Sequence, residues 1–554
     1  MESTFFGINI STSGLFAARR GLHVVSHNIA NTKTEGYSRQ RVDSYQRPPF
    51  KLPSGKGSIG TGTESNFVIQ IRSDFLDIRT RTENTVLGEW EVKEGLLDNI
   101  DTIFNEPSDS SLNTSMNEFF RSLKELNTNP QDLSVRALVR QKGIAFIKNC
   151  ALVHNSLVKL QNDIDFNIRQ KIGIINEYAE EIAKLNNNIY SNELDGSMAN
   201  DLRDQRNLIL DKLSKIVNIN YYEDEQNKFH VQITGQPLVS HIFTDKLVIK
   251  DRIDIKNPYD LPRLADIEFE SKSTFKALGG EIKGYIDMRD NIDANNKGIP
   301  FYIDQISEFT DRLISELNRI NMTGFGLRGT DKIMLFTENN MSTADYEAYL
   351  MQRGFNGKAP LDVTDYVLKG TDSKLQDQEN YDIISGNIKD ILYNNPQYKS
   401  KSIRLLSDGR YYIVDRIPTN SITISKDVDR DLSKIAASSV AAGELPGNGE
   451  NALRFRNIRN NRFMYATGSP DDFMQSMISS IGVDANQAKY ITSAEKNILT
   501  DLDIKRQSLM GVSEDEEVAD MIRYQHAFSA NARMVTTFDE MLDVIINRLG
   551  TVGR

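Results

Sequence analysis

The sequence predicts a mainly α-helical protein with β-containing inserts, in which a terminal coiled-coil layer, a helical bundle and an outer mixed or mainly β domain are nested. Three observations predict this class. Apolar residues recur with helical spacing near both ends of the 554-residue chain and again in its interior. Prolines are scarce, and none lies between Pro130 and Pro237, which permits long helices. Short alternating segments typical of strands occur in two separate stretches.

The first thirty residues carry the first helical stripe. Its apolar positions alternate spacings of three and four, which is the pattern of a coiled-coil seam. The seam positions are Leu15, Ala18, Leu22, Val25 and Ile29. Because a narrow apolar stripe needs a partner stripe, we expect these residues to form an assembly interface. Two independent helices docked on globular domains are the alternative.

The C-terminal segment repeats the pattern at greater length. Its seam positions are Met521, Tyr524, Phe528, Asn531, Val535, Phe538, Leu542, Ile545 and Leu549. We expect this helix to begin after Ser513, which would act as the N-cap with Glu516 three residues later. Residues 1–60 hold eight lysines and arginines against three acids, and residues 511–554 hold four arginines against eight acids. The two ends are therefore complementary in charge, and we expect them to pair.

Between the ends lies a second set of helices. One long face has an average spacing of about 3.6 residues and consists of Ile164, Ile168, Ile172, Ile175, Ala179, Ile182, Leu185 and Ile189. Further helices are expected to start at a cap formed by Asn200 and Asp201 and at Pro300, and a pair is expected near 471–482 and 485–510. Long amphipathic helices from distant parts of the chain most simply form one bundle.

Strand patterns stand apart from these helices. Phe229, Val231 and Ile233 alternate with polar residues, and Asp408-Gly409 separates two β-prone runs in the manner of a hairpin. The predicted domains are a terminal α-helical coiled-coil domain (1–60 plus 505–554), a helical bundle (61–325 plus 430–504, with a β-containing insert near 218–285) and an outer mixed or mainly β domain (326–429).

Composition excludes several classes of function. The formal net charge of −11 does not suit a nucleic-acid partner. The chain has no run of 18 apolar residues and no cleavable signal peptide at its start, so we expect neither a membrane span nor insertion in a membrane. Its one cysteine, Cys150, lies in a helical apolar stretch, where a core position is favoured over a nucleophile.

Candidate chemical motifs also fail on spacing. His23 and His27 are four residues apart, but no third metal ligand accompanies them. Asp427, Asp429 and Asp431 resemble the start of a calcium loop but lack its glycine and its final glutamate. The Gly55-Lys56 pair lacks the remainder of a phosphate-binding loop. We therefore expect no enzyme, and no catalytic, cofactor or metal site.

One string near the N-terminus resembles a known signature. Residues 28–40 are similar to the N-terminal motif of bacterial flagellar axial proteins, that is, the rod, hook and hook-associated proteins. The residues that carry this signature are Asn28, Ala30, Asn31, Thr34, Gly36 and Tyr37. Residues 200–207 and 511–533 resemble segments of hook-associated members in the same order along the chain, whereas residues 336–430 resemble nothing that we can place.

The resemblance implies a structural protein at the junction between hook and filament, secreted through the flagellar type III export apparatus and cytoplasmic before export. It implies polymerisation through paired terminal helices into a ring. The implied partners are the hook protein, the second hook–filament junction protein and a cytoplasmic chaperone on the C-terminal helix. A hook or rod component is the nearest alternative, and an adhesin or enzyme activity in the outer domain is a more distant one.

Overall fold

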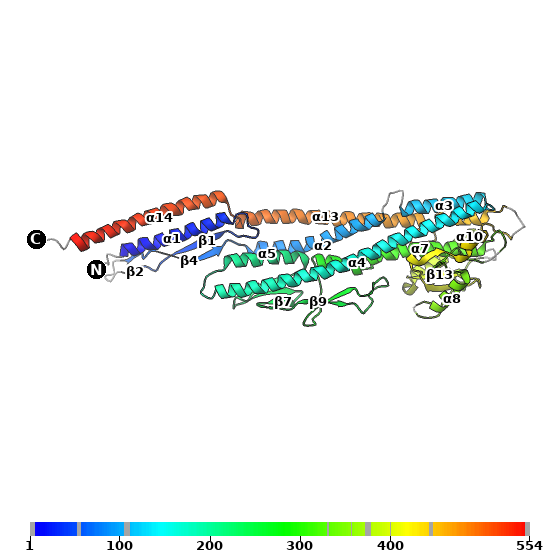
Figure 1. The fold of residues 1–554 in the computed structure, drawn as a ribbon, viewed down its shortest axis with the longest axis horizontal. Coiled ribbons are helices and arrows are strands. Elements are labelled where there is room, and N and C mark those ends of the chain that lie inside the picture. Colours follow the sequence, from blue (N-terminus) through cyan, green and yellow to red (C-terminus); the bar gives the residue numbers. More distant parts are fainter. Residues whose placement is uncertain are drawn as a thin grey trace.

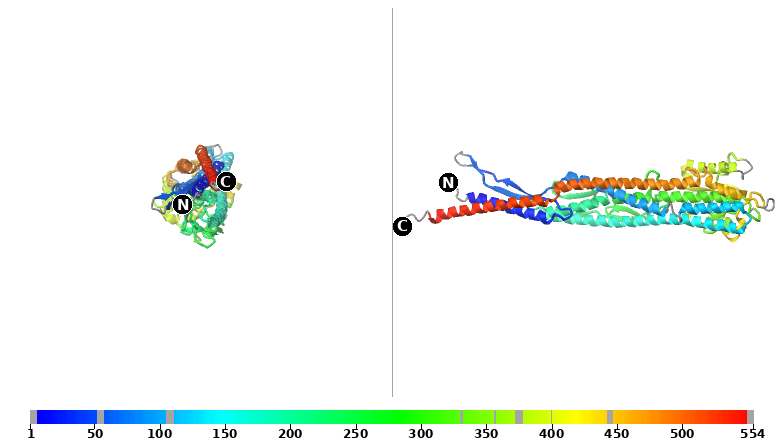
Figure 2. Two further views of the ribbon diagram at one scale, coloured as in Figure 1. Left: turned by 90° about the vertical axis from the view of Figure 1, so that its left-hand side faces the viewer. Right: turned by 90° about the horizontal axis from the view of Figure 1, so that it is seen from above.

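The computed structural model is an elongated rod with both chain ends at the same tip (Figure 1). It describes residues 6–51, 57–104, 111–329, 332–355, 357–371, 378–398, 400–441 and 447–548. The first and last helices form a thin terminal end, and the middle of the sequence forms the wider, opposite end (Figure 2). The chain therefore runs out along the rod and returns, so that residues far apart in sequence become neighbours.

Long helices account for most of the rod, because apolar residues recur along them with helical spacing. The terminal helices are α1 (Phe6–Ala30) and α14 (Glu514–Asp543), the latter followed by a π-helical turn, Val544–Arg548. The bundle helices are α2 (Asp74–Phe104), α3 (Leu112–Thr128), α4 (Leu133–Asn192), α5 (Asn200–Ile216), α6 (Glu281–Asp290), α7 (Ile299–Thr323), α12 (Glu450–Asn457) and α13 (Pro470–Met510). Shorter helices are α8 (Thr343–Arg353), α9 (Thr364–Val367), α10 (Gln378–Asn394) and α11 (Lys426–Arg430).

An antiparallel ribbon connects α1 to the bundle. Its long strands are β1 (Gln40–Gln46) and β4 (Thr63–Gln70), which pair with an irregularity between Asp43 and Tyr45. The short strands β2 (Phe50–Lys51) and β3 (Ser58–Ile59) pair farther along. The right-hand view in Figure 2 shows this ribbon extending beside the terminal helices.

The bundle is built around α4, a helix of 60 residues. All eight positions of its predicted apolar face are buried, which confirms the helical interpretation of residues 164–189. Cys150 is buried on the same helix, and burial raises the pKa of its thiol to about 12. A thiol with this pKa is protonated and unreactive at neutral pH.

The prediction of two helices over residues 471–510 is wrong, because α13 is a single helix of 41 residues. It begins at Pro470 behind a reciprocal capping box between Ser469 and Asp472. The predicted break contains Gly482, whose helical conformation costs about 1 kcal/mol relative to alanine. Packing against the antiparallel α2 carries the helix through that position.

A β-containing insert lies along α4. Its four-stranded antiparallel sheet has the order β5-β6-β7-β8, and β9 pairs with β10. The strands are β5 (Asn220–Glu223), β6 (Phe229–Ile233), β7 (Gln236–Ser240), β8 (Phe243–Thr244), β9 (Leu247–Asp251) and β10 (Ala265–Phe269). Phe229, Val231 and Ile233 are buried while the residues between them are half-buried, as the alternation predicts.

The outer region at the wide end combines helices with short strands. Strand β11 (Phe336–Glu338) pairs with β15 (Ile422–Ile424), and β14 (Tyr411–Asp415) lies between β12 (Leu361–Asp362) and β13 (Lys401–Leu405). The β13–β14 hairpin turns at Asp408-Gly409, where Gly409 has a φ of 85°. Because α8 and α10 account for more residues than the strands, the region is mixed and is not mainly β.

The predicted domain boundaries cut through structural units. A boundary at 60/61 separates β1 from its partner β4, and one at 504/505 falls inside α13. The outer region shares the bundle core through Phe336, and a smaller core around Ile384 and Ile413 stands apart from it. The outer region is therefore an extension of the bundle that carries a small core of its own.

A buried ion-pair cluster fastens the insert to the bundle. Arg252 from the insert donates to Oδ2 of Asp290 at 2.7 Å, and Arg289 donates to its Oδ1 at 2.7 Å. Both arginine side chains are 2% exposed. Burial alone would raise the pKa of Asp290, but the two guanidinium groups outweigh burial and hold that pKa below its usual value.

Acid is therefore expected to weaken the attachment of the insert. Because the folded pKa of Asp290 lies below the unfolded one, its contribution is present above about pH 4 and is lost as the pH falls through the folded pKa. Asp290→Asn should lower the free energy of unfolding by about 1–3 kcal/mol at pH 7 and flatten the decline between pH 5 and 3. Urea midpoints across this range measure the effect, with the exposed Asp254→Asn as control. Equal acid sensitivity in Asp290→Asn and wild type would contradict it.

In the ranges that the structure describes, no helix combines the length and apolarity that a membrane crossing requires.

Candidate assembly interface

The terminal helices α1 and α14 pack as an antiparallel pair through small residues. A Cβ added to Gly14 would meet Asn531 at 2.7 Å, and one added to Gly21 would meet Tyr524 at 2.6 Å. The partner of Gly7 is Phe538, which lies at the same register. The three contacts repeat every seven residues on both helices, so large side chains of α14 rest directly on the glycines of α1.

The seam observed on α1 differs from the predicted one. The positions facing α14 continue the three-and-four spacing through Gly7, Ser11, Gly14, Ala18, Gly21, Val25 and Asn28. Of the predicted residues, Ala18 and Val25 are buried, whereas Leu15, Leu22 and Ile29 are half-buried beside the contact line. A count of apolar side chains alone misses the glycines. The seven-residue spacing of Gly7, Gly14 and Gly21 was the signal available in the sequence.

On α14 the predicted seam faces α1 for most of its length. Seven of its residues are half-buried on a helix that is mostly exposed: Met521, Tyr524, Phe528, Asn531, Val535, Phe538 and Leu542. Ile545 is 44% exposed beyond the paired part, and Leu549 lies outside the described residues. Ser513 occupies the N-cap position, but its side chain makes no capping hydrogen bond, so the predicted capping box is absent.

Asn28 of the axial signature ties three segments together, with its side chain 1% exposed. Its Nδ2 donates to the Gln40 carbonyl at 2.9 Å and to Oε2 of Glu517 at 3.0 Å. Its Oδ1 accepts from the Gln40 N–H at 3.0 Å and from the Tyr37 hydroxyl at 2.7 Å. Both donors and both acceptor positions of the amide are used, which no other side chain of this size would reproduce. Asn28 therefore fixes the register of α1 on α14.

The remaining signature residues shape the turn that follows α1. Ala30 is the last residue of the helix, and Asn31 closes its end because its backbone N–H and its Nδ2 both donate to the His27 carbonyl. Thr34 donates to Oδ1 of Asn31 at 3.1 Å. Gly36 has a φ of 81°, which favours glycine, and a side chain there would meet Leu208 of α5 at 3.1 Å. Together these contacts direct the chain into β1.

Arg39 carries most of the charge pairing between the two chain ends. Its Nε donates to Oε1 of Glu517 at 2.6 Å, and one terminal nitrogen donates to Oε2 of Glu516 at 2.7 Å. Its backbone N–H donates to the Met510 carbonyl at 2.8 Å. Glu517 is 1% exposed, so this carboxylate depends on Arg39 and Asn28 for its compensation. The expected charge complementarity is thus partly satisfied within one chain.

A second polar cluster attaches the terminal end to the bundle. Asp204 of α5 accepts from the backbone N–H and the hydroxyl of Ser38 at 2.9 and 2.8 Å, and from Arg72 at 3.2 Å. Arg72 also donates to Asp77 at 2.6 Å, and Arg506 of α13 contacts Asp77 at 3.0 Å. Burial raises the pKa of Asp204 despite these donors. We call residues 28–40, 72–77, 200–211 and 506–520 the joint.

The start of α5 belongs to the joint and differs from its prediction. Asn200 is the first helical residue, after Ala199, and makes no capping bond. Its side chain instead donates to the Val68 carbonyl at 2.8 Å. Asp201 accepts from the Gln40 amide at 2.7 Å and lies 3.2 Å from Nε2 of His27. Each of these polar groups is used to hold the ribbon against α1 and α5.

The other motifs tested in the sequence make structural contacts. His27 pairs with Asp201 rather than with His23, and in the described ranges no three His, Cys, Asp or Glu side chains are grouped as metal ligands. Asp431 caps a short helical turn by accepting from the Ser433 N–H. Gly55 and Lys56 lie outside the described residues.

Two family models match the chain. The model of the flagellar hook-associated protein FlgK helical domain matches residues 97–336, and that of the flagellar basal body rod FlgEFG protein C-terminal matches residues 507–549. The first spans most of the bundle and the insert. The second begins in the last turn of α13 and spans α14, which includes the C-terminal half of the joint.

Relatives match over the whole chain. Flagellar hook-associated protein 1 of Bacillus subtilis is 28% identical, with all of both chains covered, and that of Escherichia coli is 24% identical, with 98% of this chain and 99% of the relative covered. The flagellar hook junction protein FlgK from Burkholderia pseudomallei shares the fold, with a TM-score of 0.55 at 14% identity over 78% of this chain and all of that structure.

The terminal end, where α14 pairs with α1 and meets the bundle at the joint, is thus similar to the axial proteins of the bacterial flagellum. The helical-domain model and the full-length relatives narrow this similarity to one protein. Over its whole length the chain is similar to flagellar hook-associated protein 1.

Proposed function

We propose that this chain is a structural subunit of the hook–filament junction and polymerises through its paired terminal helices. The observation that carries this proposal is the antiparallel pair of α1 and α14, which extends beyond the bundle with the β1–β4 ribbon beside it (Figure 1). Large apolar side chains remain exposed on it, among them Phe16 at 59%, Met541 at 53% and Ile546 at 67%. A two-helix hairpin buries little apolar surface alone, so it gains stability when neighbouring copies cover it.

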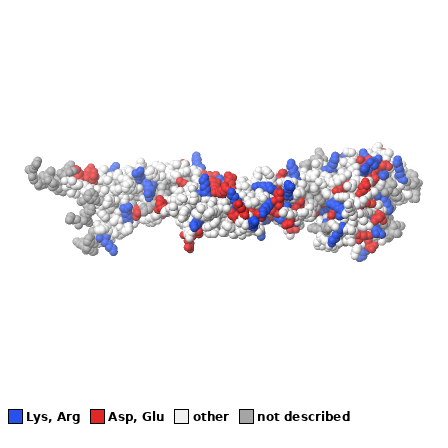
Figure 3. Space-filling model, turned by 60° about the horizontal axis from the view of Figure 1, so that its bottom comes forward, with Lys and Arg blue, Asp and Glu red and all other residues white. Residues whose placement is uncertain are grey.

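The surface charges support assembly at the terminal end. On the face drawn in Figure 3, charged side chains gather over the middle of the rod and its wide end, whereas the terminal end carries few. Depletion of charge is typical of surfaces that become buried between proteins. The name of the relatives, flagellar hook-associated protein 1, agrees with an assembly role at the hook.

For this chain we expect self-assembly in a ring, contacts with the hook protein and the second junction protein, and export through the type III apparatus. The exposed apolar side chains of α14 suit a cytoplasmic chaperone that covers this helix before export. We expect a structural role without catalysis, because the carboxylates, arginines and amides of the joint hold segments together.

Removal of residues 520–554 tests the proposal directly. Because α13 ends at Met510 and the bundle core lies elsewhere, the truncated chain should unfold with the same urea midpoint as the full chain. It should nevertheless be absent from the hook tip, since the α14 surface is gone. Immunoelectron microscopy of flagella from cells that lack the native protein measures this, with the full chain as control. Normal filament attachment by the truncated chain would refute the proposal.

A further inference from the structure

Several charged side chains at the two chain ends take no part in the pairing between α1 and α14. Arg39 is paired with Glu516 and Glu517, as described above. Within the described ranges, no side-chain hydrogen bond or ion pair holds Arg19 or Arg47 on one side, or Glu514 or Asp515 on the other. The same opposite charges that join the ends of one chain are thus still available at two separate surface positions.

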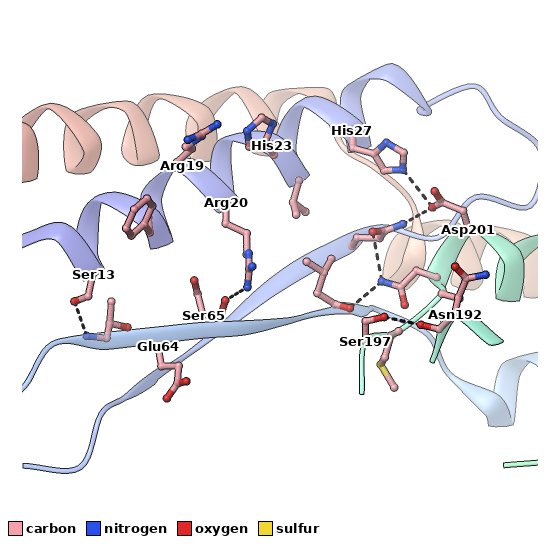
Figure 4. Close-up of a pocket in the computed structure, with 18 of the residues that line it drawn as sticks. Ser13, Arg19, Arg20, His23, His27, Glu64, Ser65, Asn192, Ser197 and Asp201 are labelled. Carbon is pink, nitrogen blue, oxygen red and sulfur yellow. Dashed lines mark hydrogen bonds and ion pairs between the residues drawn. The ribbon is translucent and has the colours of Figure 1, made fainter. Parts of the chain in front are cut away.

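The unused basic side chains line a groove of about 970 Å³ beside α1. Its walls are α1, the β1–β4 ribbon and the start of α5 (Figure 4). Figure 4 shows Arg20 reaching from α1 to the Ser65 carbonyl and His27 reaching Asp201, so these contacts hold the walls together. Arg19 and His23 lie along the same helix.

Apolar side chains accompany the charges in this groove. Phe16 from α1 and Met198 from the turn before α5 are 59% and 51% exposed. The two carboxylates of the lining are already engaged: Asp201 holds Gln40 and His27, and Glu64 has a partner of its own. The groove therefore offers free positive charge next to an uncovered apolar surface.

The first two turns of α14 present the complementary pattern. Asp515, Val518 and Ile522 are spaced by three and four residues and so share one stripe, about 10 Å long. Val518 is 48% and Ile522 is 50% exposed. Glu517, which contacts α1, lies on the opposite face, so this stripe stays open while α14 is paired with α1.

We propose that the groove receives the first two turns of α14 from a second copy of this chain, with Asp515 facing Arg19 and Arg47, and with Val518 and Ile522 covering Phe16 and Met198. The inference rests on the proposed function, because it names the contact by which copies join. An amphipathic helix in an apolar groove with matched charge is a common recognition mode. Since groove and stripe are different surfaces, the contact is heterologous and propagates into a ring or helix.

Charge exchange tests this contact in the full chain. Arg19→Asp alone and Asp515→Arg alone should each reduce the fraction of hooks that carry the protein by about tenfold, because like charges then meet. The two changes in one chain should restore the fraction, since each copy again offers opposite charges. Arg533→Asp, an exposed change elsewhere on α14, is the matched control and should have no effect.

Disulfide formation between neighbouring copies tests the same contact without relying on a loss of assembly. Arg19 and the residue of α1 that faces Asp515 are separated by about 16 Å along the helix, so cysteines at 19 and 515 cannot join within one chain. Under oxidation, Arg19→Cys with Asp515→Cys should yield linked multimers on isolated flagella, and Arg19→Cys with Glu540→Cys should not. The buried Cys150 does not compete.

The outcomes separate the two proposals. If wild-type chain sits at the hook tip but the double charge exchange gives no recovery, or the 19–515 pair links no better than the 19–540 pair, the groove contact is wrong and the junction role stands. If wild-type chain is absent from hooks, the junction role itself is wrong. Recovery together with specific 19–515 linkage supports the groove contact.

Discussion

Asn28→Ala is expected to weaken the contact that fixes the register of α1 on α14. The change removes four hydrogen bonds at a buried position and leaves the Glu517 carboxylate, 1% exposed, without its amide donor. The cost should be about 2–4 kcal/mol in the stability of the joint, because buried polar groups lose their partners. Hydrogen exchange should accelerate across residues 31–40 and 514–520 while the bundle keeps its protection, and filament attachment should be lost.

Two further variants make this expectation specific. Asn9→Ala changes an exposed asparagine on the same helix and should leave exchange and attachment as in wild type. Asn28→Asp keeps the acceptors but places a second carboxylate beside Glu517, so at neutral pH it should be at least as damaging as Asn28→Ala. Equal exchange rates in Asn28→Ala and Asn9→Ala would show that the register is set elsewhere.

Gly88→Ala is expected to cause the largest loss of stability in the bundle. Gly88 lies on α2 where the backbone of α5 passes, and a Cβ there would overlap the Lys215 carbonyl oxygen. A backbone atom cannot move aside as a flexible side chain does, so the helices must separate. Overpacking of this kind costs about 1–3 kcal/mol or more. The urea midpoint of the bundle transition should fall accordingly.

A matched glycine gives the opposite expectation. Gly173 lies on the exposed side of α4, and a Cβ added there would have nothing within 4 Å. Gly173→Ala should raise stability by about 0.5–1 kcal/mol, since alanine favours the helix and nothing opposes it. Similar midpoints for the two variants would mean that α2 and α5 are less closely packed than described.

Several elements could be predicted because local spacing was sufficient evidence. The buried face of α4, the alternation in β6 and the Asp408-Gly409 hairpin follow from side-chain period and turn chemistry. The break near Gly482 was wrong because helix propensity is a weak preference that packing against α2 outweighs. The capping role of Asn200 was wrong because its amide is used by the Val68 carbonyl.

At the interface between α1 and α14, the sequence predicted one helix face well and the other poorly. The spacing of Tyr524, Asn531 and Phe538 identifies the face of α14 that meets α1. The partner face was misjudged because glycines carry no apolar signal, although they allow the helices to approach closely. Apart from Ala18 and Val25, the residues of α1 that meet α14 are those that a count of large apolar side chains passes over.

The amino-acid sequence alone determined the helical periods, the charge difference between the two chain ends and the signature at residues 28–40. Each of these is a property of residue types and their spacing along the chain. Tertiary packing was needed to establish that Asn28 meets Glu517, that Ser38 meets Asp204 and that Arg506 meets Asp77. These pairs are separated by at least 166 positions in sequence, and hydrogen-bond partners at such separation are selected by how the helices pack.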